Sequence, residues 1–289
     1  MLGLVLLTIR ELRAKFVVVG LFAVATFVWL MLTFALNLDV VDGTLAGLKI
    51  FGQEAPLDKQ VVTSEDGETQ TVNPFGINPL ESIVVTVQQV VAGATFWVIL
   101  LLGLFATGGL VTSLMERGQI DLLLSKPISR SQLLSGRLLG VFAVVAVLVV
   151  YVLGAVWLVM SLKSGIWNGA FLYGVAVVLT MFAVLYGVVT LVSVWTGSSA
   201  LALIVSLGLI VASLVLAAGP EAETQIQQPW REVYMGLYHL LPKFPAATQA
   251  TWQLAGGEPV SSWYPLASSL AFGAVCYAAA FALFRRKDF

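Results

Sequence analysis

The sequence predicts an all-α integral membrane protein with six transmembrane helices. Hydrophobic residues make up 59% of the 289 residues and charged residues only 11%, with a mean hydropathy of +0.94. Soluble domains carry about a quarter charged residues, because most of their surface faces water. Six apolar runs are long enough for a helix to cross the hydrocarbon core. The net charge of −1 gives no support to a basic nucleic-acid-binding face.

We interpret the whole chain, residues 1–289, as a single transmembrane domain built from these runs. None of the six contains Asp, Glu, Lys, Arg or His, and they comprise residues 16–36, 83–114, 138–162, 169–195, 199–218 and 264–284. The second run is long for one span, so we expect it to tilt or to project beyond the bilayer. Gly103, Gly108 and Gly109 are the positions where it can bend or admit a neighbouring helix.

Residues 1–15 predict a helix that lies along the membrane surface. Hydrophobic residues recur on one helical face, whereas Arg10 and Arg13 lie elsewhere. The recurring positions are Leu2, Val5, Ile9, Leu12 and Phe16. The alternative is that residues 1–36 form one bent helix. The apolar stretch exceeds the roughly 7–15 residues of a signal-peptide core, so we expect the first span to be retained.

The distribution of basic residues predicts the orientation of the chain. With both termini in the cytoplasm, the inner segments hold ten basic and four acidic residues, and the outer segments hold five basic and twelve acidic residues. Lys and Arg are enriched on the cytoplasmic side of membrane proteins. We therefore expect both termini to lie in the cytoplasm.

The first outer segment, residues 37–82, contains a pattern typical of a β-hairpin. Partly alternating Val and Thr flank Asp66 and Gly67, and Asp-Gly is a favoured hairpin turn. We therefore expect a small β-hairpin in this extracytoplasmic segment.

The second outer segment, residues 219–263, predicts a short amphipathic helix. We expect this helix to be closed by Pro242 and Pro245 and to lie at the outer surface or dip into it. Trp263 and Tyr264, at the start of the last span, suit the aromatic belts of membrane interfaces.

The sequence lacks the residues that enzymes of the common classes need. No glycine is followed by lysine, so no G-x-x-x-x-G-K-[ST] phosphate loop is present. Ser198 and Ser199 belong to an inner turn, where one of them is expected to cap the fifth span, whereas His239 is assigned to the opposite side. A single cysteine, Cys276, allows neither an intramolecular disulfide nor a Cys/His zinc site. We therefore expect no catalytic site, cofactor or metal in this chain.

Gln88 and Gln89, in the outer part of the second span, form an unusual polar pair near the membrane. They are candidates for contact with a transported substrate, and the alternative is hydrogen bonding between helices. Because the spans carry no ionisable group, proton coupling within this chain is not expected.

The connector at residues 115–137 gathers four basic residues around a leucine triplet. Its first part, RGQIDLLLS, favours a short helix with Ile120, Leu123 and Leu124 on one side, and Pro127 separates this helix from the second part of the connector. The alternative is a helix that lies on anionic lipid headgroups.

The second part of the connector predicts the start of another helix. Ser129 and Gln132 have the S-x-x-Q spacing of a capping box, from which a helix runs into the third span. Gly136 and Gly140 give that helix a small face for close packing.

The stretch MERGQIDLLLSKPISRSQLLSGRLLG resembles the connector of ABC-2-type permeases, the membrane subunits of bacterial ATP-binding-cassette exporters. That connector typically reads Glu, a basic residue, Gly, often Thr, a Leu pair, Pro, a small residue, Arg, and a Leu-rich Gly-Lys or Gly-Arg start of the next span. The matching residues are Glu116, Arg117, Gly118, Leu122, Leu123, Pro127, Ser129, Arg130, Gly136 and Arg137. Gln119 departs from the pattern where Thr is common. The large first outer segment is similar to the branch that includes the permease of the nitrous-oxide-reductase maturation system.

This resemblance implies that residues 116–125 form a coupling helix, which docks in a groove of a separate ATPase subunit. Burial of its apolar side would contribute a few kcal/mol at about 25 cal/mol per Å². Charged residues at its ends would set the orientation more than the affinity. The implied coupling residues are Glu116, Arg117, Gly118, Ile120, Asp121, Leu122, Leu123, Leu124, Pro127 and Arg130.

The resemblance further implies the permease subunit of an exporter in the bacterial cytoplasmic membrane. Such a subunit works as a dimer, expected here to be a homodimer, with two copies of an ATPase that binds ATP and Mg²⁺. The alternative is a membrane scaffold or mechanical transmitter that acts on an extracytoplasmic protein. The substrate stays open, and the charge-free spans imply a path without strong ionic sites.

Overall fold

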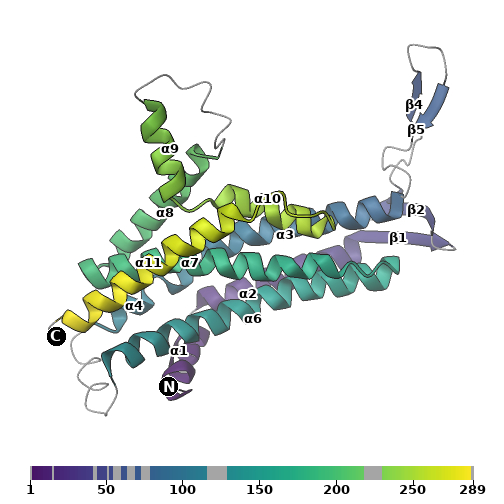
Figure 1. Cartoon of the computed structure of the whole chain (residues 1–289). Helices are drawn as coiled ribbons and strands as arrows, with labels where there is room; N and C mark the ends of the chain where they lie inside the picture. The colour runs from purple at the N-terminus through teal and green to yellow at the C-terminus, as the bar shows by residue number, and fades with distance from the viewer. Residues whose placement is uncertain are drawn as a thin grey trace.

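The computed structural model is an elongated helical bundle with β-strands at one end (Figure 1). It describes residues 2–14, 16–41, 44–50, 52–54, 60–63, 69–72, 79–115, 129–217 and 230–287. Both termini lie at the opposite end from the strands, so we refer below to the terminal end and the strand end of the bundle. The described part contains five helices, or pairs of consecutive helices, that are long and apolar enough to cross a membrane.

The helices follow the predicted apolar runs closely. They are α2 (Phe16–Ala35), α3 (Pro79–Thr107) with α4 (Leu110–Ser113), α6 (Arg130–Ser164), η1 (Gly169–Tyr173) with α7 (Gly174–Thr196), α8 (Ser199–Val215) and α11 (Tyr264–Arg286). The helix in the fifth predicted span is shorter than the predicted run. This helix, α8, has 17 residues, so it measures about 25 Å at 1.5 Å per residue, short of the roughly 30 Å hydrocarbon core.

The second predicted span is interrupted at its glycine pair. The helix α3 ends at Thr107, and α4 resumes at Leu110. A Cβ atom on Gly108 would lie 2.7 Å from Leu203 Cδ2 of α8, so the missing side chain allows these two elements to approach. This is the bend that the glycines predict.

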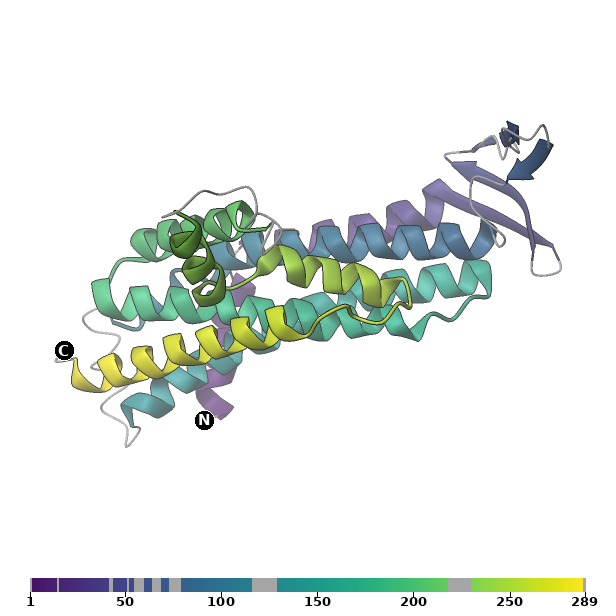
Figure 2. The same ribbon diagram turned by 45° about the horizontal axis from the view of Figure 1, so that its top comes forward.

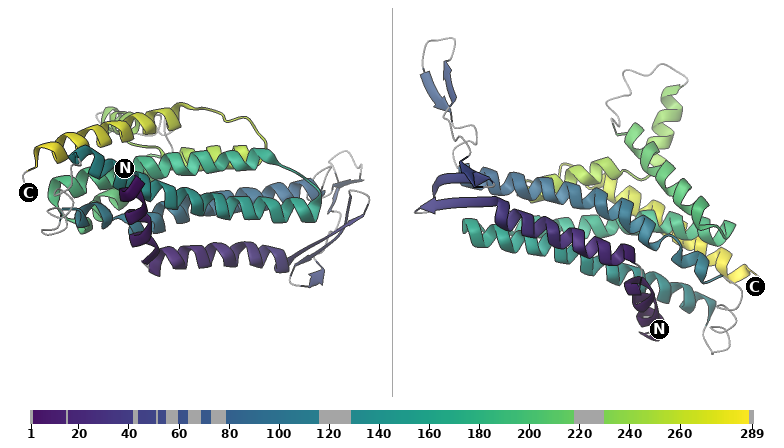
Figure 3. Two further views of the ribbon diagram at one scale, coloured as in Figure 1. Left: turned by 90° about the horizontal axis from the view of Figure 1, so that it is seen from below. Right: turned by 180° about the vertical axis from the view of Figure 1, so that it is seen from behind.

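The N-terminal helix is separate from the first span. Helix α1 (Leu2–Ala14) meets α2 at a sharp angle and lies across α6 (Figure 3). The close approach of α1 to α6 depends on Gly140, where a Cβ atom would lie only 2.5 Å from Thr8 Cβ. A separate N-terminal helix is thus present, and its contact with α6 uses one of the two glycines assigned to a packing face.

Helix α7 forms the centre of the bundle. It packs against α3, α6, α8 and α11. Tyr186, buried at its middle, stacks on Phe182 with ring centroids 5.7 Å apart, and both rings meet the edge of Phe142 from α6. Such offset and edge-to-face pairs are the favoured arrangements of aromatic rings, so this cluster joins α6 and α7.

Two sheets lie at the strand end. The first has the order β1 (Leu36–Val41), β2 (Thr44–Ile50), β3 (Gln53–Glu54), all antiparallel, with a bulge at Asp39/Val40. It begins directly where α2 ends. The second is an antiparallel pair, β4 (Gln60–Thr63) and β5 (Thr69–Val72), in which Thr63 pairs with Thr69. The pairing agrees with the two strands of the predicted hairpin, and residues 64–68 between them lie outside the described residues.

The second outer segment contains two helices where the sequence predicted one. They are α9 (Trp230–Leu240), which buries none of its residues, and α10 (Phe244–Ala255). Pro242 follows α9 as predicted, but the assignment of Pro245 to a helix end was wrong. Pro245 stands in the first turn of α10, where a missing backbone N–H is harmless because that donor has no helical partner.

Helix α10 lies along α3 and α7 within the strand half of the bundle (Figure 2). Two glycines leave room for this close packing of α10. A Cβ atom on Gly93 would lie 2.3 Å from Trp252 Nε1, and a Cβ atom on Gly174 would lie 3.2 Å from Thr251 Cγ2. The segment therefore enters the bundle through α10, while α9 stays exposed.

The contact at Gly140 makes a testable prediction about stability. Alanine at this position would clash with Thr8, so we expect Gly140→Ala to lower the free energy of unfolding by about 1–3 kcal/mol. Gly154 lies on the same helix, and a Cβ atom added there would meet no other atom within 4 Å. Gly154→Ala should therefore raise stability by up to about 1 kcal/mol. Chemical denaturation in detergent measures both, and equal effects would contradict the packing role.

Candidate functional site

The coupling segment predicted from the sequence lies mostly outside the described residues. Nine of its ten assigned residues fall within 116–128, namely Glu116, Arg117, Gly118, Ile120, Asp121, Leu122, Leu123, Leu124 and Pro127. The structure instead describes both flanks of the segment, which end at Met115 and begin again at Ser129, together with the tenth assigned residue, Arg130. The candidate site is therefore built from the supports on either side.

The downstream flank begins with the predicted capping box. Ser129 Oγ accepts a hydrogen bond from Gln132 N at 3.2 Å, and Gln132 Oε1 accepts one from Ser129 N at 3.1 Å. These reciprocal bonds satisfy two backbone donors that a helix start leaves free. The cap starts α6 at Arg130, so the helix extends about two turns before the apolar run itself.

Arg130 ties the start of α6 to the end of α11. Its Nη1 donates to Arg285 O at 3.3 Å and also to Lys287 O. Lys287 Nζ in turn donates to Val194 O near the end of α7, at 2.7 Å. Cations at helix carboxyl ends are favourable because they meet unpaired carbonyls and the negative end of the helix dipole. The start of α6 is thus held against two other helices.

Arg137 forms a buried polar junction at the terminal end. Its side chain is 2% exposed; Nε donates to Leu110 O at 3.0 Å, Nη2 donates to Ser113 Oγ at 2.8 Å, and Nη1 donates to the Glu11 carboxylate. A buried guanidinium needs such partners, because an unpaired buried charge is strongly destabilising. We call these four residues the Arg137 junction.

The Arg137 junction joins three elements around the coupling segment. Leu110 and Ser113 belong to α4 before the segment, Arg137 to α6 after it, and Glu11 to α1. The sequence interpretation used Arg137 and Glu11 only in the charge count and in the connector pattern, and missed their pairing. One signal was present: Glu11 is the only acidic residue before Asp39.

The substrate-path candidates Gln88 and Gln89 both bind neighbouring elements. Gln88 is fully buried, and its Oε1 accepts a hydrogen bond from Asn168 Nδ2 at 2.8 Å, while the same Nδ2 donates to Ala255 O at 2.7 Å. Gln89 Nε2 donates to Trp252 O at 3.2 Å. These bonds connect the end of α10 to α3 and to the segment before η1. Both glutamines thus take part in hydrogen bonding between elements, which was the alternative to substrate contact.

Lys243, in the second outer segment, is a buried cation. Although assigned to an outer segment, it is only 5% exposed, and its Nζ donates to Ser268 Oγ at 3.0 Å and to Leu241 O at 3.4 Å. The ammonium group also lies 4.8 Å from the ring centroid of Tyr238 and 5.1 Å from that of Tyr264. Among the described residues no carboxylate pairs with it. Burial lowers the pKa of this ammonium group.

The sequence candidates for catalysis have structural partners. Ser198 Oγ accepts from Leu201 N at 3.3 Å and caps α8, as predicted. His239 Nδ1 is hydrogen-bonded to Tyr264 Oη at 2.6 Å and holds the end of α9 against α11. Within the described ranges, no cluster of three or more His, Cys, Asp or Glu residues that would suit a metal is found.

The family model for ABC-2 family transporter proteins matches residues 10–289, nearly the whole chain. The chain belongs to this family. No curated protein and no solved structure matches it. This ABC-2 protein is accordingly a multi-pass membrane component of a transporter, and its family normally partners with an ABC ATPase. The resemblance drawn from the connector is confirmed at the level of the family.

The Arg137 junction predicts an energetic coupling between α1 and α6. The side chain of Glu11 is 35% exposed, so we expect Glu11→Gln to lower the free energy of unfolding by about 1–2 kcal/mol, because part of the buried charge loses its partner. Glu258→Gln, in an exposed connector, is the control and should change nothing. In an Arg137→Met background the cost of Glu11→Gln should nearly vanish. Additive effects in the double-mutant cycle would contradict the pairing.

Proposed function

We propose that this chain is the permease subunit of an ABC exporter, coupled through residues 116–125 to a separate ATPase that binds ATP and Mg²⁺. The observation that carries the proposal is the arrangement around the coupling segment in a member of this transporter family. The Arg137 junction and Arg130 support both flanks of the segment. A short helix held in this way can pass movement to the membrane helices.

The terminal end of the bundle faces the cytoplasm in this proposal. Ten basic residues against four acidic ones are assigned to that side, and the opposite side carries the acidic excess. Arg130 and Arg137, together with both termini, lie at the same end of the bundle (Figure 1). The coupling segment therefore emerges where a cytoplasmic ATPase would meet it.

Movement of the docked segment would travel by two routes. Through α4 it reaches α3, and through Arg130 and Arg137 it reaches α6, α11 and α1. The strand half is linked to the same helices, because Gln88 and Gln89 of α3 hold α10. An ATPase cycle at one end can thus change the position of α10 at the other. The substrate would pass at the interface between two copies of the chain.

One observation favours a second candidate function, a mechanical transmitter that acts on an extracytoplasmic protein. Strand β1 continues directly from α2, and Lys163 Nζ of α6 donates to Thr33 O and Leu36 O where the two meet. A sheet fastened in this way to two membrane helices would follow their movement. The two functions share the same coupling to an ATPase and differ in what moves at the strand end.

Docking is tested by adding charge to the apolar side of the coupling segment. We expect the double variant Leu123→Glu, Leu124→Glu to abolish co-purification of the partner ATPase, because the buried apolar surface is replaced by carboxylates. Gln119→Glu, which adds charge at a polar position of the same segment, should retain the ATPase. Membrane yield checks insertion in each case. If the ATPase still co-purifies with the double variant at wild-type levels, the docking assignment is wrong.

Transport is tested in vesicles that contain both subunits. We expect ATP-dependent movement of the substrate into or out of these vesicles, and its loss when the phosphate-binding lysine of the ATPase is replaced by alanine. The control is the same complex with a non-hydrolysable ATP analogue. A complex that moves no compound, but whose ATP hydrolysis responds to an extracytoplasmic protein, would contradict the exporter and support the transmitter.

A further inference from the structure

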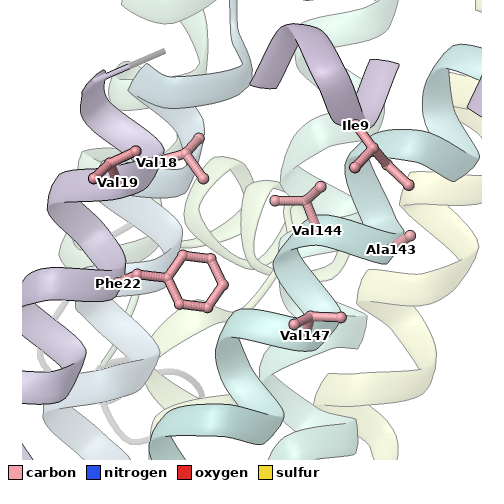
Figure 4. Close-up of a pocket in the computed structure, with 7 residues that line it drawn as sticks. All are labelled: Ile9, Val18, Val19, Phe22, Ala143, Val144 and Val147. Carbon is pink, nitrogen blue, oxygen red and sulfur yellow. The ribbon is translucent and has the colours of Figure 1, made fainter. Parts of the chain in front are cut away.

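An apolar groove lies at the terminal end, where α1 turns into α2. It has a volume of about 430 Å³ and is lined by Ile9 of α1, Val18, Val19 and Phe22 of α2, and Ala143, Val144 and Val147 of α6 (Figure 4). We call it the elbow groove. Its volume lies within the range of about 300–1,000 Å³ that is usual for ligand sites, yet all seven side chains are hydrocarbon.

The groove exists because α2 contacts α6 only farther away from the terminal end. At the terminal end α1 occupies the surface of α6, through Thr8 at Gly140 and Glu11 at Arg137. Deeper in the bundle, Tyr151 Oη of α6 is hydrogen-bonded to Thr26 Oγ1 at 2.9 Å and to Trp29 Nε1 at 3.0 Å. Between these two contacts the facing side chains are mostly Val and Ala, which are too small to close the space.

The groove lies within the depth of one leaflet of a bilayer, measured from the Arg137 junction. Its lining on α6 runs from Ala143 to Val147, about 6 Å, and Val147 lies ten residues, or about 15 Å, beyond Arg137. Half of a hydrocarbon core measures about the same. Water is a poor occupant, because an apolar cavity offers it no hydrogen bonds. A hydrocarbon chain of the adjacent leaflet has the chemistry to fill it and reaches this depth.

The positive charge beside the groove favours a lipid with an anionic headgroup. Arg10 directly follows the groove residue Ile9 and is exposed, and the sequence places Arg13 and Lys15 within the next five residues. Glu11, the only acidic residue before Asp39, is paired with Arg137. The one acidic neighbour of Arg10 in the sequence is thus already paired. An exposed cation beside an apolar groove is complementary to an anionic amphiphile.

We propose that the elbow groove binds an anionic phospholipid, with one acyl chain between α2 and α6 and its headgroup beside Arg10. The lipid fills the space that the α1–α6 contact creates and completes the packing of α2. This assignment is independent of the transported substrate and of the ATPase.

The test compares lipids retained by the full-length protein. The chain is reconstituted in bilayers of equimolar phosphatidylglycerol and phosphatidylcholine, extracted, and analysed by native mass spectrometry. We expect wild-type protein to retain phosphatidylglycerol in preference to phosphatidylcholine. Val144→Trp and Val19→Trp fill the groove from opposite walls and should each abolish the retained lipid. Arg10→Gln should weaken the preference for phosphatidylglycerol about fivefold, the factor expected for one cation near an anionic surface.

Matched controls separate the groove from the rest of the membrane surface. Leu158→Trp adds the same ring at an exposed position of α6 outside the groove, and Arg286→Gln removes an exposed cation at the end of α11. Both should behave as wild type. Unfolding midpoints identify any variant that fails to fold. Because two groove variants are made, the proposal is still tested if one of them does not fold. Unchanged retention in the folded groove variants, or equal retention of both lipids by the wild type, would overturn the proposal.

Discussion

The burial of one guanidinium group determines how the terminal end of this protein is built. Arg137 lies where the third apolar span begins, and its charge cannot be left without partners in surroundings that exclude water. Its partners therefore come from two neighbouring elements: a carbonyl and a hydroxyl from α4, and a carboxylate from α1. Through the Glu11 carboxylate, this group helps to hold α1 across α6, beside the elbow groove.

The contacts that hold α10 use neutral hydrogen bonds for the same purpose. Gln88, Gln89 and Asn168 connect α3, α10 and the segment before η1 through amide groups and carbonyls. Such bonds between membrane helices contribute modestly, about 1 kcal/mol each. The weaker contacts around α10 thus differ in kind from the ionic junction beside the coupling segment.

Much of the fold was predictable because its signals are local. Apolar runs define the helices, the S-x-x-Q pattern at Ser129 defines a helix start, and Asp66 with Gly67 marks a hairpin. The insertion of α10 was not predictable in the same way. It depends on Gly93 and Gly174, which lie far from α10 in sequence and show their function only when the helices are packed.

The candidate site likewise has one part that local sequence predicts and one part that forms only when distant residues pack together. The connector pattern identified the family, but the supports of the segment involve residues more than a hundred positions apart, such as Arg137 with Glu11 and Arg130 with Lys287. The burial of Lys243 was not predictable either. Its neighbours in the sequence do not indicate the partners that packing supplies, which are Ser268, a carbonyl and two aromatic rings.

The shortness of α8 has a consequence for biogenesis. Two backbone N–H groups at the start of α10 are satisfied by side chains: Lys243 N donates to Ser269 Oγ at 2.9 Å, and Phe244 N donates to Ser213 Oγ at 3.0 Å. Helix α10, with 12 residues, is too short to be recognised as a span during membrane insertion. Its acceptors belong to α8 and α11, so this corner of the molecule can assemble only after α11, which is synthesised after both, has entered the bilayer.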